Sequence, residues 1–195
     1  GEQLESNYHV PNTNECKDCH VTSDVVVPLG PRARQLDRTH DYGAGPVNQL
    51  DHLVSLGLLD RAPGASRRKL VDPFDPAAGT LEYRVRSYFD ANCAHCHTTG
   101  GSASQSALLL DLDSTDPAMP RANWGVCKVP TSASDTCGNV FDVVPGAPEE
   151  SILVCRLSSS QLDTRMPPLG SAVIHDEGVA LVSEWIAAMP AETCQ

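Results

Sequence analysis

Apolar side chains recur every three or four positions in several stretches of the chain, which is the spacing of one face of an α-helix. We expect four helices, at Val47–Leu58, Thr80–Asn92, Pro148–Leu157 and Asp176–Met189. The first follows a proline, and Thr80 can cap the second. Little of the chain shows the two-residue alternation that is typical of strands. The pattern therefore predicts an all-α protein.

Residues 60–79 interrupt this helical pattern. They include three prolines and two glycines and show no helical periodicity, which is typical of a linker. Two parts are predicted, a small N-terminal module over residues 1–75 and a second domain over residues 76–195. Apart from its helices the chain is expected to be mainly loop, above all over residues 98–146, which are rich in Gly, Ser, Thr, Asp and Pro.

The net charge restricts the partners. With 195 residues, of which 41 % are hydrophobic, the chain can bury a core, and its formal charge is −11. Nucleic acids and anionic lipids attract Lys and Arg, so neither is expected as a partner. A basic protein partner is favoured instead, and the alternative is that the acidity only keeps the protein soluble.

No apolar run approaches the roughly 18 residues that a membrane-spanning helix needs, so we expect a soluble chain without a membrane span. Residues 1–6 have neither a basic segment nor an apolar one, and a targeting segment is expected to lie outside this sequence.

The eight cysteines fall into two groups. Four of them form two C-x-x-C-H runs, Cys16–His20 and Cys93–His97, and the other four are scattered through the last third of the chain. Two thiols at this spacing, followed at once by an imidazole, suit covalent haem, because the cysteines add to the vinyl groups and the histidine ligates the iron. The runs therefore predict two covalently bound haem c groups, with His20 and His97 on the two irons.

Two other chemistries use paired cysteines. A thioredoxin-like redox pair would require a βαβ pattern, which these surroundings do not show. Zinc held by the four thiolates of both runs is possible in principle, but it would leave His20 and His97 without a role.

Met166 is the candidate for the second axial ligand of the haem at Cys93–His97. It lies in the loop sequence RMPPLG, where prolines stiffen the backbone around a weak thioether ligand. Met119 is its rival but follows His97 too soon to cross to the opposite face of a haem, and Met189 is expected in the core. His95 is expected to be solvated, since the two residues between the cysteines face away from their own iron.

The second ligand of the first haem is less determined. No methionine precedes Met119, so a histidine, a lysine, water or an open position remains. His9, His40 and His52 are the candidates, and His52 is favoured because it lies at the edge of a predicted helix. A second histidine would give this haem the lower potential of the two.

Eight segments carry a resemblance to a known family. In order they are VPNTNECKDCH, PLGPRARQLDR, NQLDHLVSLGLLD, YFDANCAHCH, GVCKVP, VVPGAPEESILVCRL, RMPPLG and EGVALVSEWIAAM. With them the chain resembles a family of bacterial dihaem c-type cytochromes over nearly its whole length. The resemblance implies a cytochrome c-like fold of short helices and long loops around the haems. Residues 1–75 would be a haem-binding module and residues 76–195 a cytochrome c domain.

The resemblance also implies the sites and the function. It assigns Cys16, Cys19 and His20 to the first haem, and Cys93, Cys96, His97 and Met166 to the second. The implied function is soluble electron transfer between redox partner proteins in the periplasm or another extracytoplasmic space, without enzymatic activity. The alternative is a dihaem peroxidase-like enzyme with an open or displaceable ligand on the first haem, although no general acid–base pair stands out.

Four cysteines lie outside the two runs, and of these Cys137, Cys155 and Cys194 are not a general feature of the family. In an exported protein they are expected to form disulfides, with Cys127–Cys137 and Cys155–Cys194 as the simplest of three pairings. Free buried thiols are the alternative.

Overall fold

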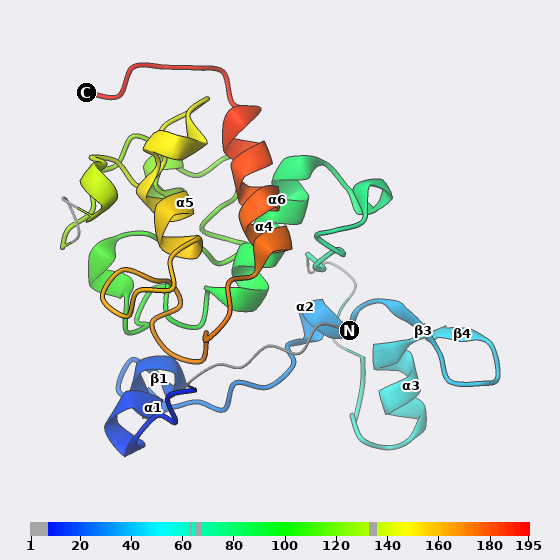
Figure 1. Cartoon of the computed structure of the whole chain (residues 1–195). Coiled ribbons are helices and arrows are strands. Elements are labelled where there is room, and N and C mark those ends of the chain that lie inside the picture. The colour runs from blue at the N-terminus through cyan, green and yellow to red at the C-terminus, as the bar shows by residue number, and fades with distance from the viewer. Residues whose placement is uncertain (1–7, 63, 65–67, 133–135) are drawn as a thin grey trace.

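The computed structural model describes residues 8–62, 64, 68–132 and 136–195. In these ranges the chain is mostly helix and loop, with two small sheets (Figure 1). The α-helices are α1 (Thr13–His20), α2 (Ala33–Leu36), α3 (Gln49–Ser55), α4 (Leu81–Asn92), α5 (Ile152–Leu157) and α6 (Asp176–Ala187). The strands are β1 (Val21–Thr22), β2 (Val25–Val26), β3 (Thr39–Asp41) and β4 (Pro46–Asn48). Short 3-10 turns lie at Pro76–Ala78, Ser104–Ser106, Arg121–Trp124, Thr136–Gly138 and Pro148–Glu150.

The four predicted helices are present, with shorter bounds for some of them. α3 begins two residues later than expected, because the preceding residues pair as strand β4. The third predicted helix divides into a 3-10 turn and α5, which begins after Ser151. α4 begins as expected, since the Thr80 side chain accepts a hydrogen bond from the backbone N–H of Tyr83 at 3.2 Å.

The N-terminal region differs from the prediction of loops. The first C-x-x-C-H run lies on α1, where the Asn12 side chain accepts from the backbone N–H of Glu15 at 3.1 Å. The Glu15 carboxylate in turn accepts from the N–H of Asn12 at 2.7 Å. This capping box is readable in the sequence as Asn-x-x-Glu. The helix was therefore predictable from its cap, although its short length hides any periodicity.

The expectation that the chain lacks strands was also wrong. β1 and β2 form one antiparallel hairpin, and β3 and β4 form another. The first turns through Ser23 and Asp24, which both have positive φ, and the second through Gly43 and Gly45. Strands of two or three residues are too short to leave an alternating pattern. Residues 1–6 and part of the expected linker lie outside the described residues.

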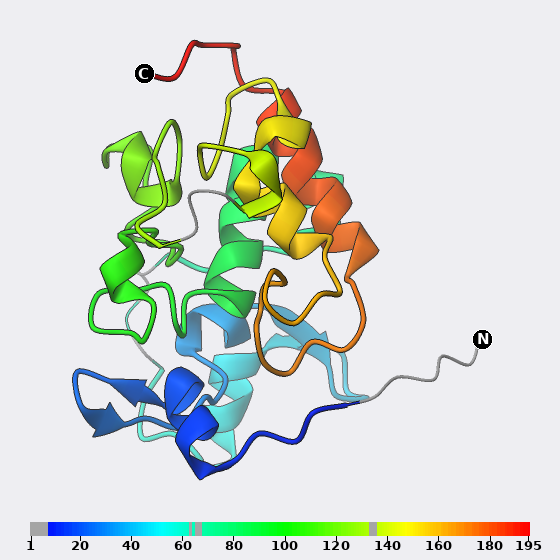
Figure 2. The same ribbon diagram turned by 60° about the vertical axis from the view of Figure 1, so that its left-hand side comes forward.

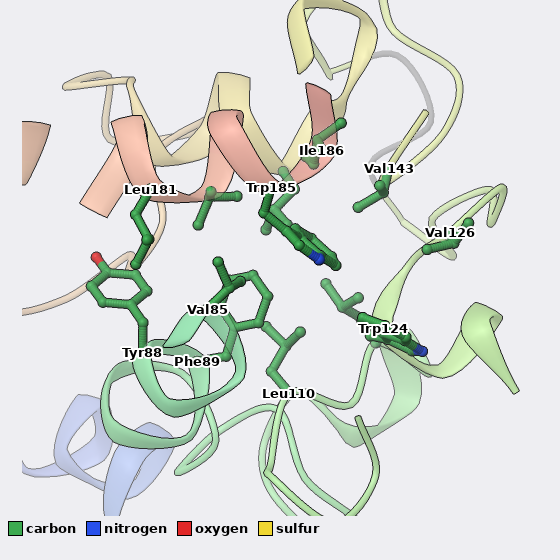
Figure 3. Packing of buried hydrophobic residues seen from close by; sticks show 13 residues of the cluster. Val85, Tyr88, Phe89, Leu110, Trp124, Val126, Val143, Leu181, Trp185 and Ile186 are labelled. Carbon is green, nitrogen blue, oxygen red and sulfur yellow. The ribbon is translucent and has the colours of Figure 1, made fainter. Parts of the chain in front are cut away.

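The core lies in the second half of the chain, where α4 crosses α6 (Figures 1 and 2). Trp185 of α6 stacks on Trp124 with ring centroids 5.4 Å apart and meets Phe89 of α4 edge-on at 5.8 Å (Figure 3). The helices approach closely at Gly178, where a Cβ atom would overlap the Tyr88 side chain. Burial of these aromatic faces holds α4, which leads into the second run, against α6.

The N-terminal part has little core of its own. Among the described residues up to position 80, Leu50 is the only one that is fully buried. Figure 1 shows α1 with the first hairpin at one side of the lower edge, and α2, α3 and the second hairpin at the other. This part therefore depends on contacts with the second half of the chain.

Asp90 of α4 provides one such contact. Its side chain is fully buried and accepts hydrogen bonds from the Arg34 guanidinium at 3.0 Å and the Leu112 backbone N–H at 2.9 Å. Arg32 lies 3.8 Å from the other carboxylate oxygen, and Arg34 also reaches Asp113 at 2.9 Å. These ion pairs join α2 and the preceding residue Arg32 to α4.

The disulfides are Cys127–Cys194 and Cys137–Cys155, so the predicted pairing was wrong. The chain end returns beside residues 121–127 after α6, where Arg121 meets Glu192 at 3.1 Å. This return places Cys194 next to Cys127, with Cα atoms 5.0 Å apart, and leaves Cys137 to meet Cys155 of α5. In the part of the chain that the structure describes, no helix has the length and apolar character to cross a membrane.

Candidate haem attachment sites

The second C-x-x-C-H run continues the end of α4 as a helical turn. The backbone N–H of Cys93 donates to Phe89 at 2.8 Å, and the N–H of His97 donates to Cys93 at 2.9 Å. A Cβ atom at Gly101 would overlap the backbone of Cys96, so the following Gly-Gly pair lets the chain fold back over the run. The turn brings the two cysteines and His97 to one side of α4.

A cavity of about 260 Å³ lies against this turn. It is lined by residues from both runs and from the RMPPLG loop, including Cys93, Cys96, His97 and Met166. Figures 1 and 2 show the loop between α5 and α6 reaching down towards α1. The structure thus brings the four residues that the sequence assigned to the second haem to the same cavity.

The other methionines lie elsewhere. Met119 is 46 % exposed and does not line this cavity. Met189 packs against the hydrophobic core, as expected. Met166 is fixed in its loop by a hydrogen bond from its backbone N–H to the Arg156 carbonyl at 2.9 Å.

Most of the cavity wall is apolar, with three charged residues in it, Asp18, Asp142 and Arg156. The apolar side includes Leu108, Leu110, Ile152, Leu153, Leu157 and Leu169. Burial raises the pKa of Asp142 even though Lys128 lies 2.9 Å from its carboxylate. Burial lowers the pKa of Arg156, whose Nε donates to the Thr164 carbonyl at 2.8 Å. The cavity therefore combines an apolar wall with two acidic residues and one arginine.

His97 is oriented by a backbone carbonyl. Its Nδ1 lies 3.0 Å from the Leu108 carbonyl oxygen, which fixes Nδ1 as the protonated nitrogen and leaves Nε2 with its lone pair. Burial lowers the pKa of His97, so the ring is neutral at pH 7. Burial also raises the pKa of the Cys93 thiol to about 12. This site offers the buried, protonated Cys93 thiol and an oriented neutral imidazole.

The first run shows the same orientation of its histidine. His20 Nδ1 lies 3.2 Å from the carbonyl oxygen of Val27, the residue that follows β2, again leaving Nε2 free. This run is less enclosed than the second, because Cys16 is exposed and only Cys19 and the neighbouring Asp18 reach the cavity.

The two runs contact each other. The sulfur atoms of Cys19 and Cys96 lie 4.0 Å apart, and Cys96 Sγ lies 3.2 Å from the Asp18 carbonyl oxygen. Ser102 donates to the same carbonyl, and the N–H of Ser23 donates to Gly100 at 2.9 Å. Burial, with Cys96 nearby, raises the pKa of the Cys19 thiol to about 11. The structure thus places the two predicted attachment sites side by side.

His95 is half-buried at this contact, rather than solvated as expected. Its ligand nitrogen and the sulfurs of Cys19 and Cys96 all lie within 4.8 Å of one another. Burial lowers its pKa, and Arg32, His97 and His20 act in the same direction. No sequence pattern signals this group, because its members come from distant parts of the chain.

The donor atoms do not form the four-thiolate zinc site. Among the described residues, the group close enough to share an ion is Cys19, His95 and Cys96, without Cys16 or Cys93. A structural zinc site requires four ligands. The haem chemistry agrees better with the donor set, since at the second run it accounts for both cysteines, the oriented His97 and Met166.

The histidines predicted for the first haem lie apart from His20 or are already paired. His52 is on α3, which Figure 1 shows far from α1, and its ring stacks on Tyr42 at 3.7 Å. His40 of β3 meets the same tyrosine edge-on. His9 is exposed, and its Nε2 lies 3.0 Å from the Glu15 carboxylate. The structure brings neither His40 nor His52 to the first run, and it places His9 beside α1 with its Nε2 already paired with Glu15.

Comparisons with protein-family models, with curated proteins and with solved structures give no match for this chain. The site is therefore interpreted from its own residues, which form two adjacent C-x-x-C-H runs and a cavity shared by Cys93, Cys96, His97 and Met166.

Proposed function

We propose that the protein is a dihaem c-type cytochrome of cytochrome c-like fold, which carries electrons between partner proteins outside the cytoplasm. One observation carries this proposal. Cys93, Cys96, His97 and Met166 line a single, largely apolar cavity although they come from two distant parts of the sequence. These are the residue types that attach a haem and ligate its iron on both faces.

Each residue of the second site has its own role in holding the haem. Cys93 and Cys96 would hold the haem covalently, and His97 would ligate the iron through Nε2, since Nδ1 is bonded to Leu108. Met166 would be the second ligand. When bound, the haem supplies an iron that accepts and releases one electron. The apolar wall around it, with Leu110 and Ile152, excludes water from the site.

The first site would hold its haem through Cys16, Cys19 and His20. The shared feature is again a histidine whose Nδ1 is bonded to a backbone carbonyl. Because Cys19 and Cys96 lie 4.0 Å apart, the two haems would be attached through neighbouring sulfurs. This proximity favours electron exchange between the two haems within one chain.

The disulfides support the proposed extracytoplasmic location, and the net charge supports a basic redox partner. Disulfides persist in oxidising spaces, and the chain has two of them, which supports a periplasmic or other extracytoplasmic location. The net charge of −11 favours a basic docking face on the redox partner. Weak contacts of this kind lose strength as salt is added.

The test is a visible-spectrum redox titration of the protein after expression with a cytochrome c maturation system. Denatured protein is first assayed for covalent haem with pyridine. We expect two haems per chain and two low-spin reduction waves, of which the higher carries the long-wavelength ferric band of methionine ligation. A colourless chain, or haem that organic solvent extracts, refutes the proposal.

A second titration separates a carrier from an enzyme. The ferric protein is treated with hydrogen peroxide while the spectrum is recorded. An electron carrier with both irons fully ligated leaves the peroxide unreduced. Peroxide turnover at a high-spin haem would establish the peroxidase-like enzyme instead.

A further inference from the structure

We propose that His95 supplies the second axial ligand of the iron held by Cys16, Cys19 and His20, so that the attachment run of one haem ligates the other. This inference rests on the proposed function. It identifies a residue that the motif itself leaves without a role, since His95 is one of the two variable positions between Cys93 and Cys96.

Elimination among the seven histidines is the first step. His20 and His97 belong to the two motifs. His175 has its Nδ1 3.1 Å from the Tyr88 hydroxyl and is not part of the group that Cys19 forms with His95 and Cys96.

The three histidines suggested by the sequence have other contacts. Nε2 of His9 is paired with Glu15. The ring of His52 on α3 stacks on Tyr42, and the ring of His40 on β3 meets Tyr42 edge-on. His95 is the remaining histidine of the chain.

The position of His95 is the second step. Its ligand nitrogen lies within 4.8 Å of the Cys19 sulfur, which is one of the two atoms that would attach the first haem. Neither ring nitrogen of His95 has a hydrogen-bond partner in the part of the chain that the structure describes. A half-buried imidazole with an unused lone pair is thus held at the first run.

The space beside His95 is the third step. A groove of about 760 Å³ lies between the arm that follows α1 and the end of α4, and His95 lines it. Val27, whose carbonyl orients His20, lines the same groove. The volume is within the range of about 300–1,000 Å³ that is typical of small-molecule sites. The groove thus reaches His20 only through Val27, while Cys19 and His95 both line the neighbouring cavity of the second run.

The assignment has a structural consequence. The first iron would take one ligand from each half of the chain, His20 from α1 and His95 from the turn after α4. Ligation would then depend on the same docking that Asp90 and the two arginines provide. It also explains how a first module without a methionine obtains a fully ligated iron.

The test uses the full chain with both haems attached, in three forms: the wild type, His95→Ala and the control His52→Ala. Haem content is measured with pyridine, and the ferric state is examined by electron paramagnetic resonance and near-infrared magnetic circular dichroism. In the wild type we expect one bis-histidine haem and one His/Met haem. His95→Ala should convert one of the two haems to high spin, and added imidazole should restore the low-spin signal. His52→Ala should resemble the wild type.

A second variant keeps the assignment testable if the His95→Ala protein loses a haem. His95→Met retains a ligand but exchanges imidazole for thioether. It should replace the bis-histidine band by a second His/Met band and raise the lower midpoint potential, because a thioether ligand raises the potential of haem iron.

The outcomes distinguish the two proposals. A wild type with two haems, one of them high-spin, overturns the assignment of His95 and favours an open first iron. Unchanged ferric spectra in His95→Ala and His95→Met, with two haems present, overturn it as well. Loss of the bis-histidine band in His52→Ala would transfer the role to His52. A wild type without covalent haem refutes the proposed function itself.

Discussion

The ion pair of Asp90 should be a main attachment of the N-terminal part, and its strength can be measured against a matched control. Arg34 donates to two carboxylates at nearly equal distances, 3.0 Å to Asp90 and 2.9 Å to Asp113. The side chain of Asp90 is 0 % exposed, whereas that of Asp113 is 65 % exposed. Removing each carboxylate in turn therefore compares a buried and an exposed partner of the same arginine.

The expected free energies follow from the contacts. Asp90→Ala leaves the buried N–H of Leu112 without its acceptor, which costs about 1–3 kcal/mol. Loss of the partly exposed Arg34 pair adds about 1 kcal/mol, so the total is about 2–4 kcal/mol. Asp113→Ala removes an exposed pair and should cost about 0–1 kcal/mol. Asp90→Asn can still accept from Leu112 and should lie between them.

The assay is urea unfolding of the haem-loaded variants at equal haem content, followed by far-ultraviolet circular dichroism. Thermal unfolding should show a midpoint lower by roughly 4–16 °C for Asp90→Ala and by less than about 4 °C for Asp113→Ala. If the two alanine variants agree within about 0.5 kcal/mol at an unchanged urea m-value, Asp90 is not the buried attachment described above.

Three further predictions concern the second half of the chain. Met166→Ala should lower the higher midpoint potential by on the order of 0.1 V in a redox titration, while Met119→Ala leaves it unchanged; equal effects would remove Met166 as the ligand. Trp185→Ala should cost about 3–5 kcal/mol in urea unfolding because it leaves a cavity against Trp124, and a cost below about 1 kcal/mol would contradict the packing. Peptide mapping without reduction should recover Cys194 linked to the Cys127 peptide, and Cys194→Ala should cost about 4 kcal/mol through the long loop that the bridge closes; recovery of Cys194 with Cys155 would contradict the structure.

The sequence predicted the longer helices well because their signals are local. α4 and α6 each have 12 residues, which is enough for an apolar face and a cap to be recognised. α1 was missed although its capping box is readable, since it has 8 residues and buries none of them. The strands were missed because pairs of two or three residues carry no period. Prediction thus failed for short elements, which have no residue periodicity of their own and depend on contacts with neighbouring segments.

The disulfides show the same limit. Chain proximity favoured Cys127 with Cys137, but the structure joins Cys127 to Cys194, separated by 67 positions. That choice depends on where α6 delivers the chain end, which is decided by the packing of Trp185 and Ile186 in the core. No spacing of cysteines contains this information.

By itself the sequence determined the residue types of the candidate sites. The two C-x-x-C-H runs and the RMPPLG segment can be read from the order of residues, because covalent haem attachment requires thiols and imidazole at a fixed local spacing. The acidic character follows from the composition alone. Only the tertiary structure decided which of these residues meet. It brought Met166 to the cavity of His97, Cys19 to Cys96, and His95 to the first run, while it left His52 beside Tyr42. The physical reason is that these contacts are long-range, and they are fixed by the burial of α4 against α6 and by the buried charge of Asp90.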